Sequence, residues 1–171
     1  LIFCAIVVLF SLVIPVCILV YWVIRGVSAG EPLLLLWSHT ANSLFVSGFA
    51  AVLAVIAAVP IAILVVRYPS RINGILERFS YIGFALPGVV VALALVFFGV
   101  RYANPIYQTL WLLIFAYIIL FLPSALGSIK ASLLQISPRL EEAAMTLGRS
   151  HINVLFTIVL PLLRPGLLAG L

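Results

Sequence analysis

Four long apolar runs without a charged side chain constrain this chain more than any other feature. They cover about residues 1–24, 40–66, 79–100 and 103–129, and the last is expected to be helical from about 108. The hydrocarbon core of a bilayer is about 30 Å thick, which about 20 helical residues cross. Each run is therefore predicted to be a transmembrane helix, because lipid cannot satisfy open backbone groups and the alternation of a barrel strand is absent.

Composition excludes a water-soluble domain. Of the 171 residues, 66% are hydrophobic and 8% are charged, whereas soluble domains carry about 25% charged residues. A fifth apolar run begins near residue 161 and is too short to cross a bilayer within the sequence given. We expect it to be the start of a further span. We also expect the chain to be a piece of a longer protein, since its only methionine is Met145.

The basic residues predict the orientation of the spans. Grouping alternate loops places seven of the nine Lys and Arg residues on one side: Arg67, Arg71, Arg78, Lys130, Arg139, Arg149 and Arg164. Cytoplasmic loops carry the excess of Lys and Arg in membrane proteins. The amino end and residues 130–160 are therefore expected to be cytoplasmic. This bias and contact with anionic lipid explain the net charge of +5 without a nucleic acid partner.

Several function classes are disfavoured by what the sequence lacks. No acidic, basic or histidine residue lies deep inside a predicted span, which argues against a proton pump or a voltage sensor. No P-loop motif is present, so the chain is not expected to hydrolyse ATP itself. Cysteine and histidine show no metal-binding spacing, and we expect neither a metal site nor a cofactor. No residue forms a convincing substrate site.

Two features of the spans bear on helix packing. Prolines interrupt the runs and tend to kink helices, at Pro15, Pro60, Pro87 and Pro123. The second run carries a strip of small residues at helical spacing, formed by Ser43, Ser47, Ala51 and Ala54 with Gly48 beside them. Such strips let helix backbones approach closely. We interpret this strip as ordinary packing between helices, with a moving helix contact as the alternative.

The segment 130–160 breaks the pattern of long apolar runs and is predicted to form two short helices. Ser137 is a favourable N-cap for the first, with Pro138 at its first position, and Gly148 is placed to end it. The second is expected to start after Ser150 and to run to about residue 159. At about 15 Å, the first helix is too short to span a membrane.

The two faces of the first short helix differ in polarity. We expect its apolar stripe to pack on the membrane bundle: Ile136, Leu140, Ala143, Ala144 and Leu147. The opposite face carries Arg139, Glu142 and Thr146 and could contact a soluble partner. The alternative is a helix that lies on the lipid surface. The acid on the polar face and the absence of Trp argue against that alternative.

The same segment carries a spaced motif that resembles a known family. It matches, at all seven positions, the EAA signature of binding-protein-dependent ABC transporter permeases: Glu142, Ala143, Ala144, Gly148, Ile158, Leu160 and Pro161. The resemblance implies an all-α, polytopic helix bundle of the type I ABC importer permease kind with short cytoplasmic coupling helices. It also implies that these residues dock on an ATPase subunit. Glu142 would be the acidic contact, Ala143 and Ala144 would pack closely, and Gly148 would form the turn.

Further tripeptides resemble the ferric iron permease subgroup: Asn42-Ser43-Leu44, Arg67-Tyr68-Pro69 and Leu86-Pro87-Gly88. The resemblance implies a permease of the bacterial inner membrane, forming a translocation path for ferric iron. Permeases for thiamine, sulfate, molybdate or polyamines share much of this pattern and remain alternatives. The implied partners are a cytoplasmic ATP-binding subunit, a periplasmic or lipoprotein substrate-binding protein, and a second permease half or copy.

Two functions of another class stay open at this point. A secondary carrier or channel would work without an ATPase partner, and its uptake would depend on an ion gradient. A structural membrane subunit would support assembly without forming the path. The sequence also leaves open whether the whole permease is a fusion of two halves or a homodimer.

Overall fold

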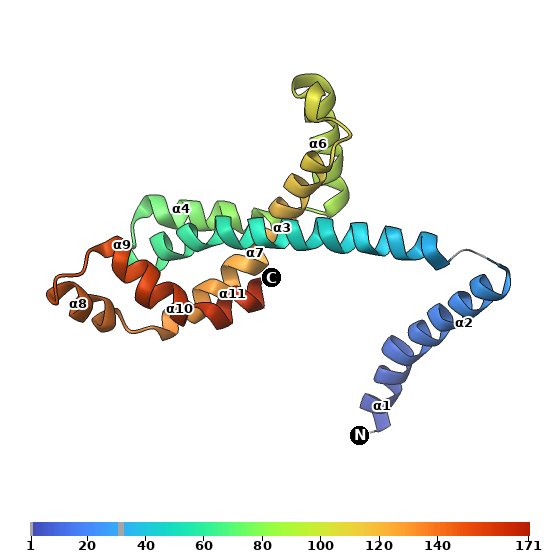
Figure 1. Cartoon of the computed structure of the whole chain (residues 1–171), viewed down its shortest axis with the longest axis horizontal. Helices are drawn as coiled ribbons and strands as arrows, with labels where there is room; N and C mark the ends of the chain where they lie inside the picture. Colours follow the sequence, from blue (N-terminus) through green and yellow to red (C-terminus); the bar gives the residue numbers. More distant parts are fainter. Residues whose placement is uncertain (1, 31–32) are drawn as a thin grey trace. The chain divides into compact units, whose positions relative to one another are not determined.

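The computed structural model describes residues 2–30 and 33–171, which contain helices and no strand (Figure 1). Residue 1, at the start of the first predicted span, lies outside this part. The chain divides into two compact units, Leu1–Leu44 and Phe45–Leu171. The boundary falls inside one long helix.

The first unit begins with an apolar helix that contains a π turn. It consists of α1 (Ile2–Val8), a π-helical turn η1 (Leu9–Val13) and α2 (Ile14–Ser28). The π turn directly precedes Pro15, which has no N–H to donate to the preceding turn. None of the side chains described from residue 6 to 28 is buried. This segment therefore presents apolar surface on all sides, as expected of a helix in lipid.

The long helix α3 (Leu33–Arg67) continues through Pro60. Its buried face is a row of alanines four residues apart, Ala50, Ala54, Ala58 and Ala62, each at most 3% exposed. This row differs from the small-residue strip expected from the sequence, of which Ala54 alone is fully buried. Small side chains at this spacing let the neighbouring helix approach closely.

The third predicted span is broken. The structure has α4 (Arg71–Ser80), α5 (Ile82–Ala85) and α6 (Gly88–Tyr102), with a 105° bend between Ala85 and Gly88. Leu86 is extended (φ −95°, ψ 125°) because the ring of Pro87 disfavours a helical residue before it. The prediction of one continuous helix over 79–100 is thus wrong in its first turns. Pro87 interrupts the helix, whereas only a kink was expected.

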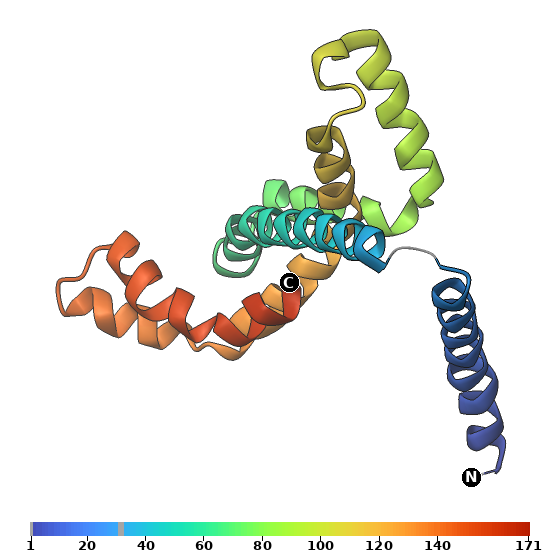
Figure 2. The same ribbon diagram turned by 45° about the vertical axis from the view of Figure 1, so that its right-hand side comes forward.

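The central element of the second unit is α7 (Leu110–Gln135), which follows a short 3₁₀ turn η2 (Asn104–Ile106). After it come α8 (Pro138–Thr146), α9 (His151–Val154), η3 (Leu155–Val159), α10 (Leu160–Leu162) and α11 (Arg164–Gly170). The second short helix expected from the sequence therefore continues through a π turn and does not end before Pro161. In both views α11 lies alongside the C-terminal half of α7 (Figures 1 and 2).

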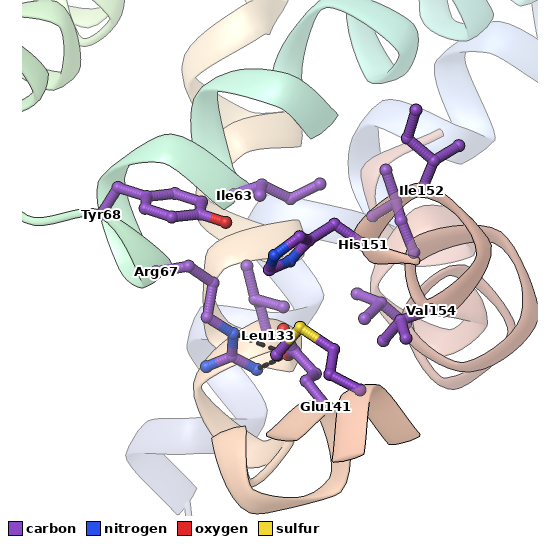
Figure 3. Close-up of a pocket in the computed structure, with 11 residues that line it drawn as sticks. Ile63, Arg67, Tyr68, Leu133, Glu141, His151, Ile152 and Val154 are labelled. Carbon is purple, nitrogen blue, oxygen red and sulfur yellow. Dashed lines mark hydrogen bonds and ion pairs between the residues drawn. The ribbon is translucent and has the colours of Figure 1, made fainter. Parts of the chain in front are cut away.

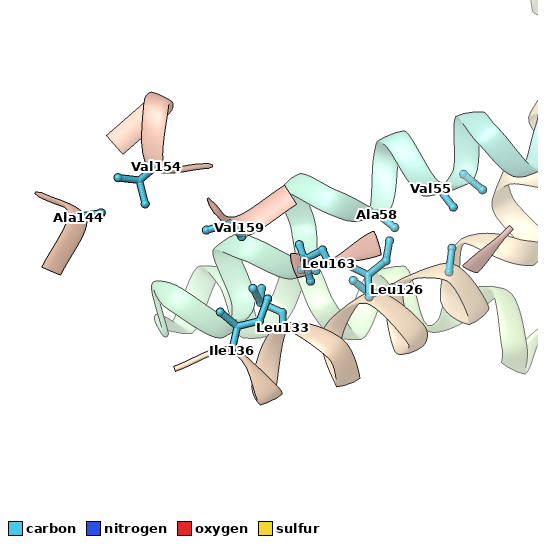
Figure 4. Close-up of a cluster of buried hydrophobic side chains, with 13 residues drawn as sticks. Val55, Ala58, Leu126, Leu133, Ile136, Ala144, Val154, Val159 and Leu163 are labelled. Atoms are coloured by element: carbon cyan, nitrogen blue, oxygen red, sulfur yellow. The ribbon is translucent and has the colours of Figure 1, made fainter. Parts of the chain in front are cut away.

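The core of the second unit joins α3, α7, α8 and the returning helices (Figure 4). Its fully buried large side chains include Leu126, Ile129 and Leu133 from α7 and Leu163 from the return. They pack against the alanine row of α3. Ala144 of α8 and Val154 of α9 extend the same cluster to the end of the unit. The short helices are therefore attached to the spans by a continuous apolar core.

Three described helical segments are long and apolar enough to cross a membrane, Ile6–Ser28, Trp37–Arg67 and Leu110–Gln135. Two bent pairs pass the same test only when each is taken as one span. They are Arg71–Ala85 with Gly88–Tyr102, and His151–Leu162 with Arg164–Gly170, the second bent by 66°. By length and composition the described part therefore holds three to five spans.

Candidate functional site

Helix α8 is delimited by local chemistry at both ends. Ser137 occupies the N-cap position predicted for it, but its hydroxyl makes no capping bond. Gly148 lies just beyond the helix with φ +84°, in the left-handed region that favours glycine. Its N–H donates to Met145 O at 3.0 Å, and the N–H of Arg149 donates to Ala144 O at 3.2 Å. These two bonds form a Schellman motif, which satisfies carbonyls at the helix end.

The buried face of α8 is not the one expected from its apolar stripe. Ala144 is 7% exposed, and Met145 and Glu141 beside it are half-buried. Leu140 and Leu147, which were expected to pack on the bundle, are 51% and 84% exposed. The helix is rotated relative to the prediction because a charged residue, Glu141, points inward to a partner on α3.

That partner is Arg67, the last residue of α3 (Figure 3). Its Nε donates to Glu141 Oε1 at 2.8 Å, and its Nη2 donates to the carbonyl oxygen of Ile136 at 2.9 Å. Ile136 is the C-cap of α7. One guanidinium therefore joins three elements: the end of α3, the end of α7 and the first turn of α8. Sequence reasoning missed this pair, which is separated by 74 residues.

A small cavity of about 160 Å³ lies next to the ion pair (Figure 3). Tyr68, His151 and Met145 line it together with apolar side chains such as Leu133. Among the residues that the structure describes, no cluster of three His, Cys, Asp or Glu could hold a metal ion. The cavity therefore lies beside the contact that joins α3, α7 and α8.

The returning helices begin with a second cap. The hydroxyl of Ser150 accepts a hydrogen bond from Asn153 N at 3.3 Å, which starts α9 at the residue predicted for it. Arg149 Nη1 donates to Thr157 Oγ1 at 3.1 Å across the turn. His151, the first residue of α9, is exposed.

The motif residues fall into two groups by exposure. Three are exposed around α8 and its end: Glu142, Ala143 and Gly148. The other four are packed into the unit, with Ala144 buried and the rest half-buried on the return: Ile158, Leu160 and Pro161. The structure thus brings the first group to one surface and uses the second group in packing.

A second ion pair joins Lys130 of α7 to Glu77 of α4. Lys130 is one of the basic residues that predict the orientation of the spans. Its side chain is 31% exposed and is directed to Glu77. The pair attaches α4 to the bundle and does not involve α8.

Residues 50–171 match the family described as binding-protein-dependent transport system inner membrane component. The chain belongs to this family. It is a multi-pass inner-membrane protein of a permease family, which serves transport rather than catalysis. The predicted all-α permease fold and the resemblance to this family are confirmed.

Similar permeases carry several substrate names. The chain is 40% identical over 163 residues to the Fe(3+)-transport system permease protein FbpB 2 of Haemophilus influenzae, covering 94% of the chain and 32% of that protein. It is 30% identical over 147 residues to the ferric transport system permease protein FbpB of Actinobacillus pleuropneumoniae, covering 86% and 21%. It is 26% identical over 129 residues to the molybdate/tungstate transport system permease protein WtpB of Pyrococcus abyssi, covering 75% and 51%. The chain thus spans a third or less of the two ferric permeases.

Proposed function

We propose that this chain forms part of the translocation path of an ATP-driven importer of ferric iron in the bacterial inner membrane. In this proposal the cytoplasmic segment 130–160 presents α8 to a separate ATPase subunit. The observation that carries the proposal is the exposed face of α8, which combines an acid with apolar side chains. The names of the most similar permeases reported above support ferric iron as the substrate.

The exposed face of α8 has the composition of a docking surface. Leu140 and Leu147 are 51% and 84% exposed, and Glu142 and Ala143 lie between them on the accessible side. A helix that lies flat on lipid buries its apolar face in the bilayer, and an acid within that face would be unfavourable there. An apolar groove with a basic rim on a soluble partner fits this face. Helix-in-groove binding uses such apolar anchors at helical spacing.

The seven motif residues then take different roles. Glu142 and Ala143 contact the ATPase, and Gly148 provides the left-handed turn that ends α8 at the right length. Ala144 packs α8 onto the core of the permease. Ile158, Leu160 and Pro161 stiffen the return toward α11 and do not contact the partner.

The mechanism that follows is alternating access. ATP binding brings two ATPase subunits together, and the α8 segments of two permease halves or copies move with them. A substrate-loaded binding protein on the other side favours the same state, because only a difference in affinity between two states can shift their equilibrium. The chain itself has no P-loop, so in this proposal a separate subunit hydrolyses ATP.

Uptake in proteoliposomes tests the importer and its substrate. The full-length permease is reconstituted with its ATPase subunit and binding protein, and uptake of radioactive ferric iron is measured against molybdate, thiamine, sulfate and spermidine. We expect ATP-dependent uptake of iron that stops when the Walker A lysine of the ATPase is replaced. Uptake that persists without ATP and collapses with the ion gradient would support a secondary carrier instead. ATP-driven uptake of another solute would contradict ferric iron as the substrate and leave the importer function in place.

A further inference from the structure

We propose that Arg67 and Glu141 are positioning residues that transmit movement of α8 into the membrane span α3. The inference rests on the proposed function, because it assumes that an ATPase moves α8. It goes beyond docking by naming the contact through which the movement reaches the translocation path. Neither residue belongs to the seven-residue motif.

The geometry makes Arg67 a link between three helices. Its guanidinium lies at the last residue of α3 and donates in two directions, to Glu141 in the first turn of α8 and to the carbonyl of Ile136 at the end of α7. The backbone at Ile136 and Ser137 is extended, so these two residues interrupt the helical path between α7 and α8. Arg67 therefore joins both sides of this interruption to α3.

The ion pair between Arg67 and Glu141 is partly buried and is therefore only partly screened by solvent. The side chains of Arg67 and Glu141 are 12% and 20% exposed. Charge-assisted hydrogen bonds of this kind are shorter and stronger than neutral ones, and partly buried pairs are less screened by salt. The ion pair must therefore break before α8 can move away from α3.

Few apolar side chains of α8 reach the core: Ala144 is buried in it, and Met145 is partly buried against it. Ala144 is the one buried residue of α8, all of whose residues the structure describes. Its methyl group offers little contact area compared with the leucines of α7. The polar junction at Arg67 is thus the specific tie between this helix and the distant span α3, 74 residues earlier in the chain.

The second ion pair provides a matched control. Lys130 and Glu77 join α7 to α4, and their side chains are 31% and 23% exposed. Removing Glu77 deletes one acid and one ion pair from the same unit. It leaves the junction between α3, α7 and α8 intact.

The test compares uptake per ATP hydrolysed in the assembled, reconstituted transporter. We expect Glu141→Gln and Arg67→Gln to lower this ratio by about three- to thirty-fold, the range seen when residues along a coupling path are changed. Arg67→Lys should lower uptake per ATP less than Arg67→Gln does, because an ammonium keeps the charge but lacks the planar guanidinium that bonds two acceptors. Glu77→Gln should stay within about twofold of the wild type. The ATPase subunit should copurify with all four variants.

Each other outcome overturns the inference in a distinct way. A wild-type ratio in both Glu141→Gln and Arg67→Gln shows that the junction does not transmit movement. Loss of ATPase copurification in Glu141→Gln shows that the residue docks the partner rather than positioning α8. If both glutamine variants insert poorly, Arg67→Lys decides, because an ammonium keeps the charge but cannot bond both acceptors as the planar guanidinium does. A wild-type uptake per ATP in that variant contradicts a role for the junction. A wild-type permease that binds no ATPase contradicts the proposed function itself.

Discussion

Glu141 and Glu142 are adjacent on α8 but have opposite environments. Glu141 Oε1 accepts a 2.8 Å hydrogen bond from Arg67 at a half-buried position, whereas the side chain of Glu142 is exposed. One acid therefore fastens the helix to the permease, and its neighbour remains accessible to a partner. The two should respond differently to substitution.

Replacing Glu142 with Lys tests the docking face. We expect copurification of the ATPase subunit to fall at least about tenfold, because like charges at an interface cost more than about 1.4 kcal/mol. The free energy of unfolding of the permease should change by less than about 0.5 kcal/mol, because the side chain is exposed. Asn153→Lys is the control, since it also introduces a lysine at an exposed position, on α9. Unchanged copurification in Glu142→Lys would remove this face of α8 from the docking surface.

Replacing Gly148 with Ala tests the turn that ends α8. A residue with a Cβ is strained at φ +84°, and we expect a cost of about 1 kcal/mol. Asn tolerates this backbone conformation better and should cost less. Hydrogen exchange of the Arg149 amide reports the effect, since this amide bonds to Ala144 O. Gly48→Ala is the control, because a Cβ there meets nothing within 4 Å; equal protection in Gly148→Ala and Gly148→Asn would contradict the strain.

Local chemistry explains what could be predicted from the sequence. The ends of α8 depend on Pro138 and Gly148, which act within a few residues of themselves, and both ends lie where they were expected. The rotation of α8 could not be predicted, because Arg67 is 74 residues away from Glu141. The apolar pattern of Leu140 and Leu147 indicated the wrong buried face.

The sequence predicted that small residues pack between the spans, but it did not predict which of them are buried. The sequence showed small residues along the second span, but packing against α7 buries the row with Ala50 and Ala58 and leaves most of the expected strip unburied. A break at Pro87 was expected as a kink. Its size could not be predicted, because it depends on how α5 and α6 pack against α7, beginning with the close approach of Gly83 to Ile119.

Replacing Gly166 with Ala tests the approach of α11 to α7. A Cβ at this position would collide with the side chain of Ser132 and lie 3.1 Å from the carbonyl oxygen of Ser128. Overpacking of this kind typically costs about 1–3 kcal/mol. We expect a lower midpoint of thermal unfolding in detergent and a partial rescue by Ser132→Gly, which removes the colliding atoms. Gly74→Ala is the control, since nothing lies within 4 Å of its added Cβ; a stable Gly166→Ala would show that α11 and α7 are further apart.

Replacing Leu133 and Leu134 in turn tests which face of α7 is buried beside the Arg67 junction. Leu133 is fully buried in the core, whereas its neighbour Leu134 is 63% exposed. Truncating a buried leucine to alanine removes packing contacts and leaves a cavity, which costs about 2–5 kcal/mol. We expect Leu133→Ala to lower the free energy of unfolding by this amount.

Leu134→Ala should change the same free energy by less than about 0.5 kcal/mol. Both variants remove the same atoms from adjacent positions, so helix propensity and composition are matched. Because Leu133 also lines the cavity beside Glu141, its truncation should loosen the ion pair and raise hydrogen exchange in the first turn of α8. Equal losses in the two variants would mean that α7 presents a different face to the core, and the position of the Arg67 junction would have to change with it.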